Sequence, residues 1–282
     1  MEADLSTQRW IDRLKLPALP HNVLRLQAVL ARPDAGIEDA AAVIAEDPSL
    51  SARVLRVANS AQFGQTKPLL SVQRAATVLG LRSLYRIALR VEIVNAFSTL
   101  LDVPGFDPRN VWRHAILTAH AASDLAEHVG VHFGELSQED YYSCGLLHDI
   151  GHIVMYDNLG LDYVQVYASA GSEEELLRAE EAHYQGLNHA DLGSLVAAMW
   201  DLPPPLPELI RFHHEPGLAP RAQGPLRIVV AADDIANCVA RHPDEEVASL
   251  VARLSDRIAI VDQSALTAVV KTACEQWKTI QV

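Results

Sequence analysis

Apolar residues recur three and four positions apart along nearly the whole chain, which is the spacing that places them on one face of an α-helix. Convincing alternation with a period of two, which would indicate strands, is absent. Residues 227–232 form an apolar run, but it lies in an alanine-rich context typical of a helix. The pattern therefore predicts an all-α fold. The expected helices cover about 37–45, 48–59, 71–79, 81–101, 109–129, 138–156, 172–184, 187–200, 206–214, 224–241 and 264–279.

Local signals fix several helix ends. Asp47 followed by Pro48 offers an N-cap aspartate and a proline at the first helical position. Gly80 is expected to end a helix. Residues 103–108 contain two prolines and a glycine, which is the clearest break in the chain. We therefore expect an N-terminal helical subdomain over 1–103, packed on a second helical subdomain over 104–282.

Composition indicates a compact protein without a membrane span. The chain has 282 residues, 49% of them hydrophobic and 21% charged, so it can bury a real core. It has no uncharged apolar run of eighteen residues and no basic start before an apolar stretch, so we expect a cytoplasmic location and no membrane partner. Its three widely spaced cysteines predict reduced thiols, not a disulfide framework or a zinc site.

The charge balance argues against nucleic acid as a partner. The formal net charge is −13, whereas binding to a phosphate backbone rests on clustered lysine and arginine. Arg74, Arg82, Arg86 and Arg90 fall near helical spacing and could form a local basic patch. A solvated helix face is the simpler interpretation of these four residues. Likewise, residues 173–175 are all glutamate and predict an exposed acidic first helical turn, which the helix dipole favours.

Seven metal-type side chains follow one another along the second half of the chain. Histidines and carboxylates in this number suit a centre of two divalent ions better than a single ion. An ionised aspartate buried beside an imidazole in an apolar run also needs a cation or hydrogen bonds to offset its desolvation. The set comprises His114, His148, Asp149, His189, His213, His214 and Asp233.

Some assignments around this set stay open. Asp234 is a second candidate beside Asp233, which we favour. His152, one turn after His148, could be a further ligand, a hydrogen-bond donor behind the ligands or a buried neutral side chain. The seven residues could also form a satisfied polar network without metal. Surface or structural roles are expected for His120, His128, His132, His183 and His242.

The order of these residues resembles a known signature. His114, His148-Asp149 and Asp233 are similar to the pattern of the HD superfamily of metal-dependent phosphohydrolases, and the added histidines resemble its dinuclear members. Further motifs, over roughly 15–242, resemble the HDOD family, the HD-related output domain of bacterial signalling proteins. These motifs are Leu16-Pro17-Ala18-Leu19-Pro20, Asp47-Pro48-Ser49-Leu50, Val57-Ala58-Asn59-Ser60, Phe63-Gly64, Leu79-Gly80-Leu81-Arg82, Trp112-Arg113-His114, Asn188-His189-Ala190 and Trp200-Asp201-Leu202-Pro203.

The resemblance implies an HD-type helical core in 104–282 with two transition-metal ions, of iron, manganese or zinc. One ion would be held by His114, His148, Asp149 and Asp233. The second would take Asp149 as a bridge together with His189, His213 and His214. The implied function is a signal-transduction regulator that acts through a protein partner or a nucleotide-type small ligand. The acidic charge balance suits a basic or apolar protein partner.

The alternatives to a regulator are enzymes. An active phosphohydrolase of nucleotides or cyclic dinucleotides would use Asp149 and His148 as its catalytic residues, and a di-iron oxygenase is a third hypothesis. Departures from the HD-GYP phosphodiesterases favour the regulator. The Gly-Tyr-Pro element lacks its tyrosine after Glu215, Asn110 stands where some of these enzymes place a glutamate, and His152 stands where a phosphate-facing lysine usually lies.

Overall fold

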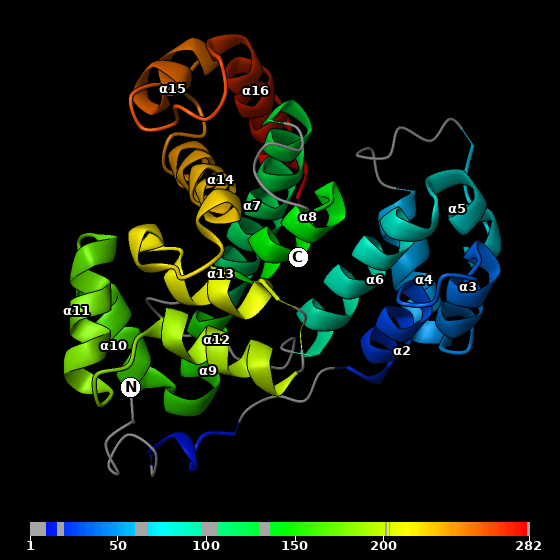
Figure 1. The fold of residues 1–282 in the computed structure, drawn as a ribbon, viewed down its shortest axis with the longest axis horizontal. Coiled ribbons are helices and arrows are strands. Elements are labelled where there is room, and N and C mark those ends of the chain that lie inside the picture. The colour runs from blue at the N-terminus through cyan, green and yellow to red at the C-terminus, as the bar shows by residue number, and fades with distance from the viewer. Residues whose placement is uncertain are drawn as a thin grey trace. The chain divides into compact units, whose positions relative to one another are not determined.

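The computed structural model describes residues 10–15, 20–59, 67–96, 107–129, 136–200, 202 and 204–280. Every regular element in these ranges is a helix, which confirms the predicted all-α class (Figure 1). The chain divides into two compact units. The smaller unit comprises Ala18–Thr99 and Glu275–Val282, and the larger unit comprises Met1–Pro17 and Leu100–Cys274. The boundary predicted at 103–104 lies outside the described residues.

The described residues also bear on the predictions for membrane spans, cysteines and the basic patch. None of its helices is both long enough and apolar enough to cross a membrane. Cys144, Cys238 and Cys274 form no disulfide, as their spacing predicts. Of the four arginines considered as a basic patch, the side chains of Arg82, Arg86 and Arg90 lie outside the description.

The smaller unit is built on an apolar core. Its largest fully buried side chains include Leu26, Ile44, Leu50 and Leu84, which come from four different helices. The helices, drawn from blue to cyan in Figure 1, are α2 (His21–Leu30), α3 (Ile37–Ala45), α4 (Pro48–Ala58), α5 (Val72–Leu79) and α6 (Leu81–Ala96).

Polar side chains in the smaller unit act at helix ends. Asp47 caps α4, and its carboxylate accepts hydrogen bonds from the backbone N–H groups of Ser49 (2.8 Å) and Leu50 (3.0 Å). Gly80 ends α5 with a φ of 84°, a conformation that glycine adopts without strain. Asn59 ends α4, and its amide exchanges hydrogen bonds with the backbone of Leu69. These ends agree with the local signals in the sequence.

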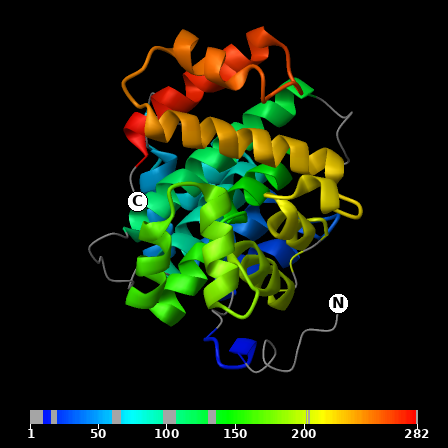
Figure 2. The same ribbon diagram turned by 90° about the vertical axis from the view of Figure 1, so that its left-hand side faces the viewer.

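The larger unit surrounds two long helices that contact each other, α7 and α14. In Figure 2, α14 runs across the unit as a single straight rod. The helices of this unit are α7 (Pro108–Val129), α8 (Gln138–Leu147), α9 (Ile150–Leu159), α10 (Leu161–Ser169), α11 (Glu173–His183), α12 (His189–Met199), α13 (Leu206–Phe212), the 3₁₀ turn η3 (Pro216–Leu218), α14 (Gln223–Arg241), α15 (Val247–Leu254) and α16 (Gln263–Thr279) as far as Cys274.

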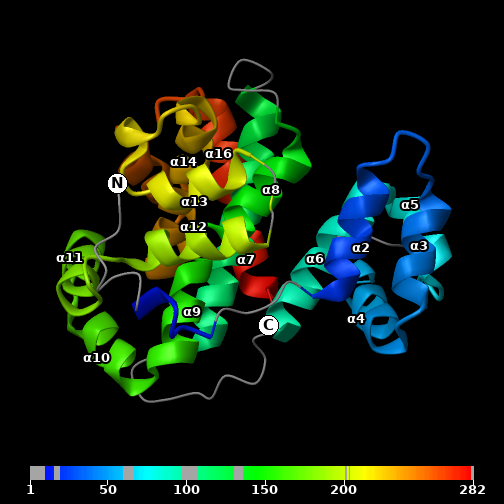
Figure 3. The same cartoon turned by 60° about the horizontal axis from the view of Figure 1, so that its bottom comes forward.

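Two glycines allow close backbone contacts in the larger unit. A Cβ atom at Gly145 in α8 would lie 2.7 Å from the Cα of Ala119 in α7. At Gly151 in α9, a Cβ would lie only 1.8 Å from the carbonyl oxygen of His189 in α12. The helices α9, α12 and α13 pack in succession, as Figure 3 shows. Glycine at these two positions therefore brings α7 to α8, and α9 to α12.

The structure corrects one predicted helix. The segment expected as a single helix over 138–156 is two helices, α8 and α9, and His148-Asp149 forms the turn between them. The apolar run hides this break because neither proline nor a cluster of polar residues interrupts it. The helices α2, α10 and α15 were also missing from the prediction. The end of the helix expected over 81–101 lies outside the described residues.

Candidate metal centre

All seven predicted metal-type residues meet in the larger unit, although they come from five separate places in the chain. His114 lies in α7, His148-Asp149 between α8 and α9, His189 at the start of α12, His213-His214 at the end of α13, and Asp233 in α14. Their donor atoms form two groups, and within each group all donors lie within 4.8 Å of one another. The groups are His114, His148 and Asp233, and Asp149, His189, His213 and His214.

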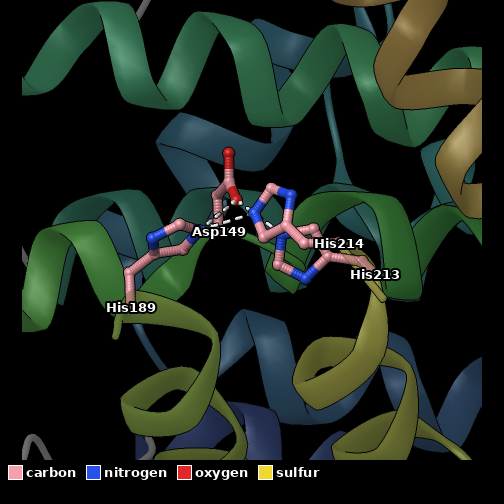
Figure 4. Close-up of side chains that lie close together, drawn as sticks. All are labelled: Asp149, His189, His213 and His214. Carbon is pink, nitrogen blue, oxygen red and sulfur yellow. Dashed lines mark hydrogen bonds and ion pairs between the residues drawn. The ribbon is translucent and has the colours of Figure 1, made fainter. Parts of the chain in front are cut away.

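Asp149 lies between the two groups and presents one carboxylate oxygen to each. Its Oδ2 is 3.1 Å from Nε2 of His148 and 3.5 Å from Nε2 of His114. Its Oδ1 is 3.2 Å from Nε2 of His213 and 3.7 Å from Nε2 of His189. Figure 4 shows the rings of the second group approaching this carboxylate from different sides. The arrangement suits a carboxylate that bridges two cations.

The first group is closed by Asp233. Its Oδ1 lies 2.9 Å from Nε2 of His114 and 3.6 Å from Nε2 of His148. Asp234, the other candidate, instead pairs with Arg257 at 2.5 Å. The structure thus brings Asp233 into the cluster and leaves Asp234 outside it.

Hydrogen bonds behind the rings set the orientation of three histidines. Nδ1 of His148 lies 2.8 Å from the carbonyl oxygen of Gly145, and Nδ1 of His213 lies 2.7 Å from that of Ile210. Nδ1 of His189 lies 2.8 Å from Oε2 of Glu180. Since these acceptors have no proton to give, Nδ1 must be the donor in each ring. In the neutral form of each ring the lone pair is then on Nε2, which faces the cluster, as in metal-binding histidines.

One of the imidazole nitrogens that face the cluster lacks a hydrogen bond. Nε2 of His213 is buried and has no hydrogen-bond partner, although it lies near Asp149. Nε2 of His189 and Nε2 of His214 are 2.8 Å apart, and those of His114 and His148 are 3.4 Å apart. A buried nitrogen without a hydrogen bond, such as Nε2 of His213, costs free energy. Imidazole and carboxylate donors of this kind fit a divalent transition metal.

Charges within the cluster reinforce one another. Burial opposes the charging of His148, but Asp149 and Asp233 outweigh burial and raise its pKa well above the usual value. Burial likewise opposes ionisation of both aspartates, but the histidines outweigh it and hold the pKa of Asp149 and of Asp233 well below the usual value. The carboxylates are therefore ionised and ready to bind a cation. Burial lowers the pKa of His213 and of His214, so both rings are neutral.

Glu180, which the sequence reasoning missed, anchors the second group. It is fully buried in α11, and its Oε2 accepts hydrogen bonds from both the backbone N–H (2.9 Å) and Nδ1 of His189. Its Oε1 accepts a hydrogen bond from the Tyr163 hydroxyl at 2.8 Å. Burial lowers the pKa of His189, but Glu180 outweighs burial and raises it to about 9. A carboxylate one turn after the buried Leu176, on the apolar face of α11, was the available signal.

His152 lies behind the second group. Its ring stacks on that of His189, with centroids 3.7 Å apart, and its Nε2 is 4.0 Å from Oδ1 of Asp149. Its Nδ1 lies 2.5 Å from the hydroxyl of Tyr163. Because that hydroxyl gives its proton to Glu180, Nδ1 of His152 must be the donor. Burial lowers the pKa of His152 to about 3, so the ring is neutral.

Glu173 departs from the exposed acidic turn that the sequence predicts. Its side chain is 44% exposed, but its Oε1 is buried and has no hydrogen-bond partner. This oxygen lies 3.4 Å from Nε2 of His214 and 3.8 Å from Nε2 of His189. Burial raises the pKa of Glu173 to about 7. The acidic run therefore contributes one carboxylate to the cluster.

A pocket of about 260 Å³ adjoins the second group, with which it shares His214. Two arginines line it, and each is paired with a carboxylate: Arg178 with Glu174 at 2.5 Å, and Arg211 with Asp191. Its lining residues are Glu174, Leu177, Arg178, Glu181, Asn188, Ala190, Arg211, His214 and Glu215.

The sequence model of one protein family matches most of the chain. Residues 16–216 match the model of the HDOD domain. An uncharacterised protein of Treponema pallidum (strain Nichols) is 30% identical over 239 residues. The match covers 83% of this chain and 44% of that protein, so the chain spans less than half the length of the curated relative.

Solved structures share the fold. A crystal structure of an HDOD domain protein of unknown function from Geobacter sulfurreducens has a TM-score of 0.78 and 25% identity, covering 96% of this chain and 94% of that one. A protein from Shewanella amazonensis SB2B, provisionally assigned as a phosphohydrolase, has a TM-score of 0.77 and 24% identity, and the match covers 98% of both chains.

Proposed function

Because the chain belongs to the HDOD family, we propose that it is a signal-transduction regulator whose larger unit holds a dinuclear metal centre. In this proposal His114, His148 and Asp233 hold one ion, and His189, His213 and His214 hold the other. Asp149 bridges the two ions. Iron, manganese and zinc are the candidate metals, because imidazole and carboxylate donors suit all three.

One observation carries the metal centre. Nε2 atoms of four proposed ligand histidines lie 3.1–3.7 Å from the Asp149 carboxylate. Three of these rings have their other nitrogen bonded to a fixed acceptor. A polar network without metal would pair these nitrogens with donors or acceptors, whereas Nε2 of His213 is buried without a hydrogen bond. The ions would supply positive charge at this point and offset the burial of the carboxylates.

The surroundings of the centre support a regulator over a hydrolase. A phosphate substrate needs cationic groups that are free to neutralise it. Both arginines of the adjoining pocket are already paired with carboxylates. His152, at the position where related hydrolases carry a lysine, is neutral because burial lowers its pKa to about 3. The pocket therefore offers a phosphate little net positive charge.

The second candidate is a metal-dependent phosphohydrolase. The contact between pocket and cluster at His214 favours it, since a ligand in the pocket would reach the second group. The provisional assignment of the Shewanella amazonensis protein also points in this direction. In that case Asp149 and His148 would be the catalytic residues, and a nucleotide or cyclic dinucleotide would be the substrate.

The partners of a regulator follow from the charge of the chain. A net charge of −13 suits a basic or apolar protein partner and disfavours nucleic acid. A nucleotide-type small ligand in the pocket would be the alternative input. We propose that the protein works with such a partner in the cytoplasm.

Elemental analysis combined with turnover assays separates the two functions. The protein would be purified without chelators or affinity metals, and its metal content measured by mass spectrometry. Hydrolysis of bis(p-nitrophenyl) phosphate and of cyclic dinucleotides would then be followed with added Mn²⁺. A regulator predicts bound metal without turnover. Turnover that disappears in His148→Ala would replace the regulator with the hydrolase, and protein without metal would refute the centre itself.

A further inference from the structure

Glu173 enters the cluster from a helix that contributes none of the seven proposed ligands. It is the first residue of α11, whose first turn is fixed by the cap of Ser172 on the backbone N–H of Glu175 (3.3 Å). Its Oε1 forms a third group of donor atoms with His152 and His189. This carboxylate oxygen therefore lies beside the second group, although the sequence pattern predicted it in solvent.

The periodicity of α11 explains why Glu173 faces inwards. Residues 176 and 180 follow residue 173 by three and seven positions, so all three share one face of the helix. Leu176 and Glu180 on this face are both buried, and Glu180 holds His189. Glu173 is thus the outermost member of the face that α11 turns towards the histidines.

A role in offsetting the helix dipole does not account for this position. Acidic residues at a helix start are stabilising while they remain in water. Glu174 fits that role, because its side chain is 75% exposed and pairs with Arg178. Glu173 instead buries Oε1 without a hydrogen bond, which is unfavourable for a carboxylate oxygen. A cation between Oε1 and the imidazole nitrogens would offset this cost.

We infer that Glu173 is a further ligand of the second metal ion and fastens α11 to the metal centre. The inference rests on the proposed dinuclear centre. The second ion would then have five protein ligands: Glu173, Asp149 and three histidines. A site that the protein fills in this way is typical of structural metal sites, whereas catalytic sites keep a position open for substrate.

Fastening has a consequence for the adjoining pocket. Glu174, Leu177, Arg178 and Glu181 of α11 form one of its walls. If Glu173 binds the ion, loading of the metal orders this wall together with the centre. Metal occupancy would then make this wall more rigid, which connects the centre to ligand binding.

Titration with Co²⁺ tests the inference without an activity assay. Chelator-stripped wild type, Glu173→Gln and Glu173→Ala would be titrated, with the visible absorption of Co²⁺ reporting its ligand set. Hydrogen exchange of the α11 amides would be measured with and without Co²⁺. Glu174→Gln is the matched control, because it removes the adjacent charge of the same helix. Circular dichroism of the metal-free variants would verify that all four proteins fold alike.

The expected result is that both Glu173 variants bind one Co²⁺ ion at least about tenfold more weakly than the wild type. The Co²⁺ spectrum should change, and α11 should lose its metal-dependent protection, while Glu174→Gln behaves as the wild type. Two ions bound with unchanged affinity and protection in both Glu173 variants would overturn the role of Glu173 and leave the dinuclear centre intact. A wild type that binds no Co²⁺ would refute the centre and, with it, this inference.

Discussion

The two units of this protein are built from the same kind of helix but place their polar groups differently. In the smaller unit the core cluster is apolar, and side chains such as Asp47 and Asn59 bond to the backbone at helix ends. In the larger unit, buried histidines and carboxylates meet at the point where five segments of the chain converge. The first core stabilises itself by burial, whereas the second is stable only if its charges are compensated.

The smaller unit therefore contributes stability, whereas the larger unit carries the candidate functional site. Apolar burial is insensitive to metal and only weakly sensitive to pH, so the smaller unit should behave alike with or without ions. The larger unit carries the orphaned nitrogen of His213 and the buried oxygen of Glu173. Metal binding should stabilise the larger unit because ligand binding to the folded state shifts the unfolding equilibrium.

The largest effect should come from Gly151→Ala in the larger unit. The new Cβ would lie 1.8 Å from the backbone oxygen of His189, and backbone cannot move aside as a flexible side chain can. We expect a loss of more than about 4 kcal/mol in the free energy of unfolding, together with loss of bound metal. Chemical denaturation and elemental analysis would measure both. Gly217→Ala is the control, since a Cβ there meets no atom within 4 Å. Equal stability of the two variants would contradict the close packing of α9 on α12.

Leu50→Ala should destabilise the smaller unit and leave the metal centre unchanged. Leu50 is fully buried in the apolar core, and such truncations cost about 2–5 kcal/mol because they leave a cavity. Urea denaturation would give the loss, with Leu70→Ala as a control at an 83% exposed leucine. Metal content of the folded Leu50→Ala protein should equal that of the wild type. A loss of ions in this variant would show that the two units do not behave independently.

Glu180→Gln should weaken the second ion through His189. Glutamate accepts from both N–H groups of His189 and from Tyr163, whereas glutamine offers one oxygen and turns an amide donor towards the remaining donors. Losing such an orienting partner reduces metal affinity by about 10–100-fold. Isothermal titration of chelator-stripped protein would measure the change. The neighbouring Glu181→Gln variant should keep the metal affinity of the wild type. Equal metal affinities in both variants would show that Glu180 does not support the centre.

The smallest effect should come from Asp47→Ala at the N-cap of α4. Loss of a capping aspartate costs about 1 kcal/mol. Hydrogen bonds from the backbone of Leu50 and Ser49 hold the pKa of Asp47 below its usual value. A lowered folded pKa means that the contribution is complete above the unfolded value of about 4 and disappears as the pH falls below it. Urea denaturation at pH 7 and near pH 3 should show the variant closer to the wild type at the lower pH. If the free energies of unfolding of variant and wild type differ equally at both pH values, the effect comes from helix propensity and not from the capping carboxylate.

The sequence predicted those features of the fold that depend on neighbouring residues. The cap at Asp47 and the stop at Gly80 follow from local backbone chemistry, and the helical spacing of apolar residues gave the all-α class. The turn at His148-Asp149 was missed because its cause is tertiary. The two side chains reach the cluster from the break between α8, which packs on α7, and α9, which packs on α12.

The candidate site shows the same division. The seven residues were found because their types are distinctive and their order resembles a known signature. Glu173 and Glu180 were not found, since on a helix this rich in charge their spacing from Leu176 is the one signal that separates them from glutamates facing water. Only the position of α11 against His189 distinguishes these two from the exposed Glu174.

The most direct test of the dinuclear centre is the metal content of wild type, Asp149→Ala and His128→Ala, each purified without chelators or affinity metals. Asp149 presents one oxygen to each group of donors, whereas His128 is exposed near the end of α7. We predict two ions per chain in the wild type and in His128→Ala, and none in Asp149→Ala. Two ions retained in Asp149→Ala would contradict the bridge, and a wild type without metal would contradict the centre.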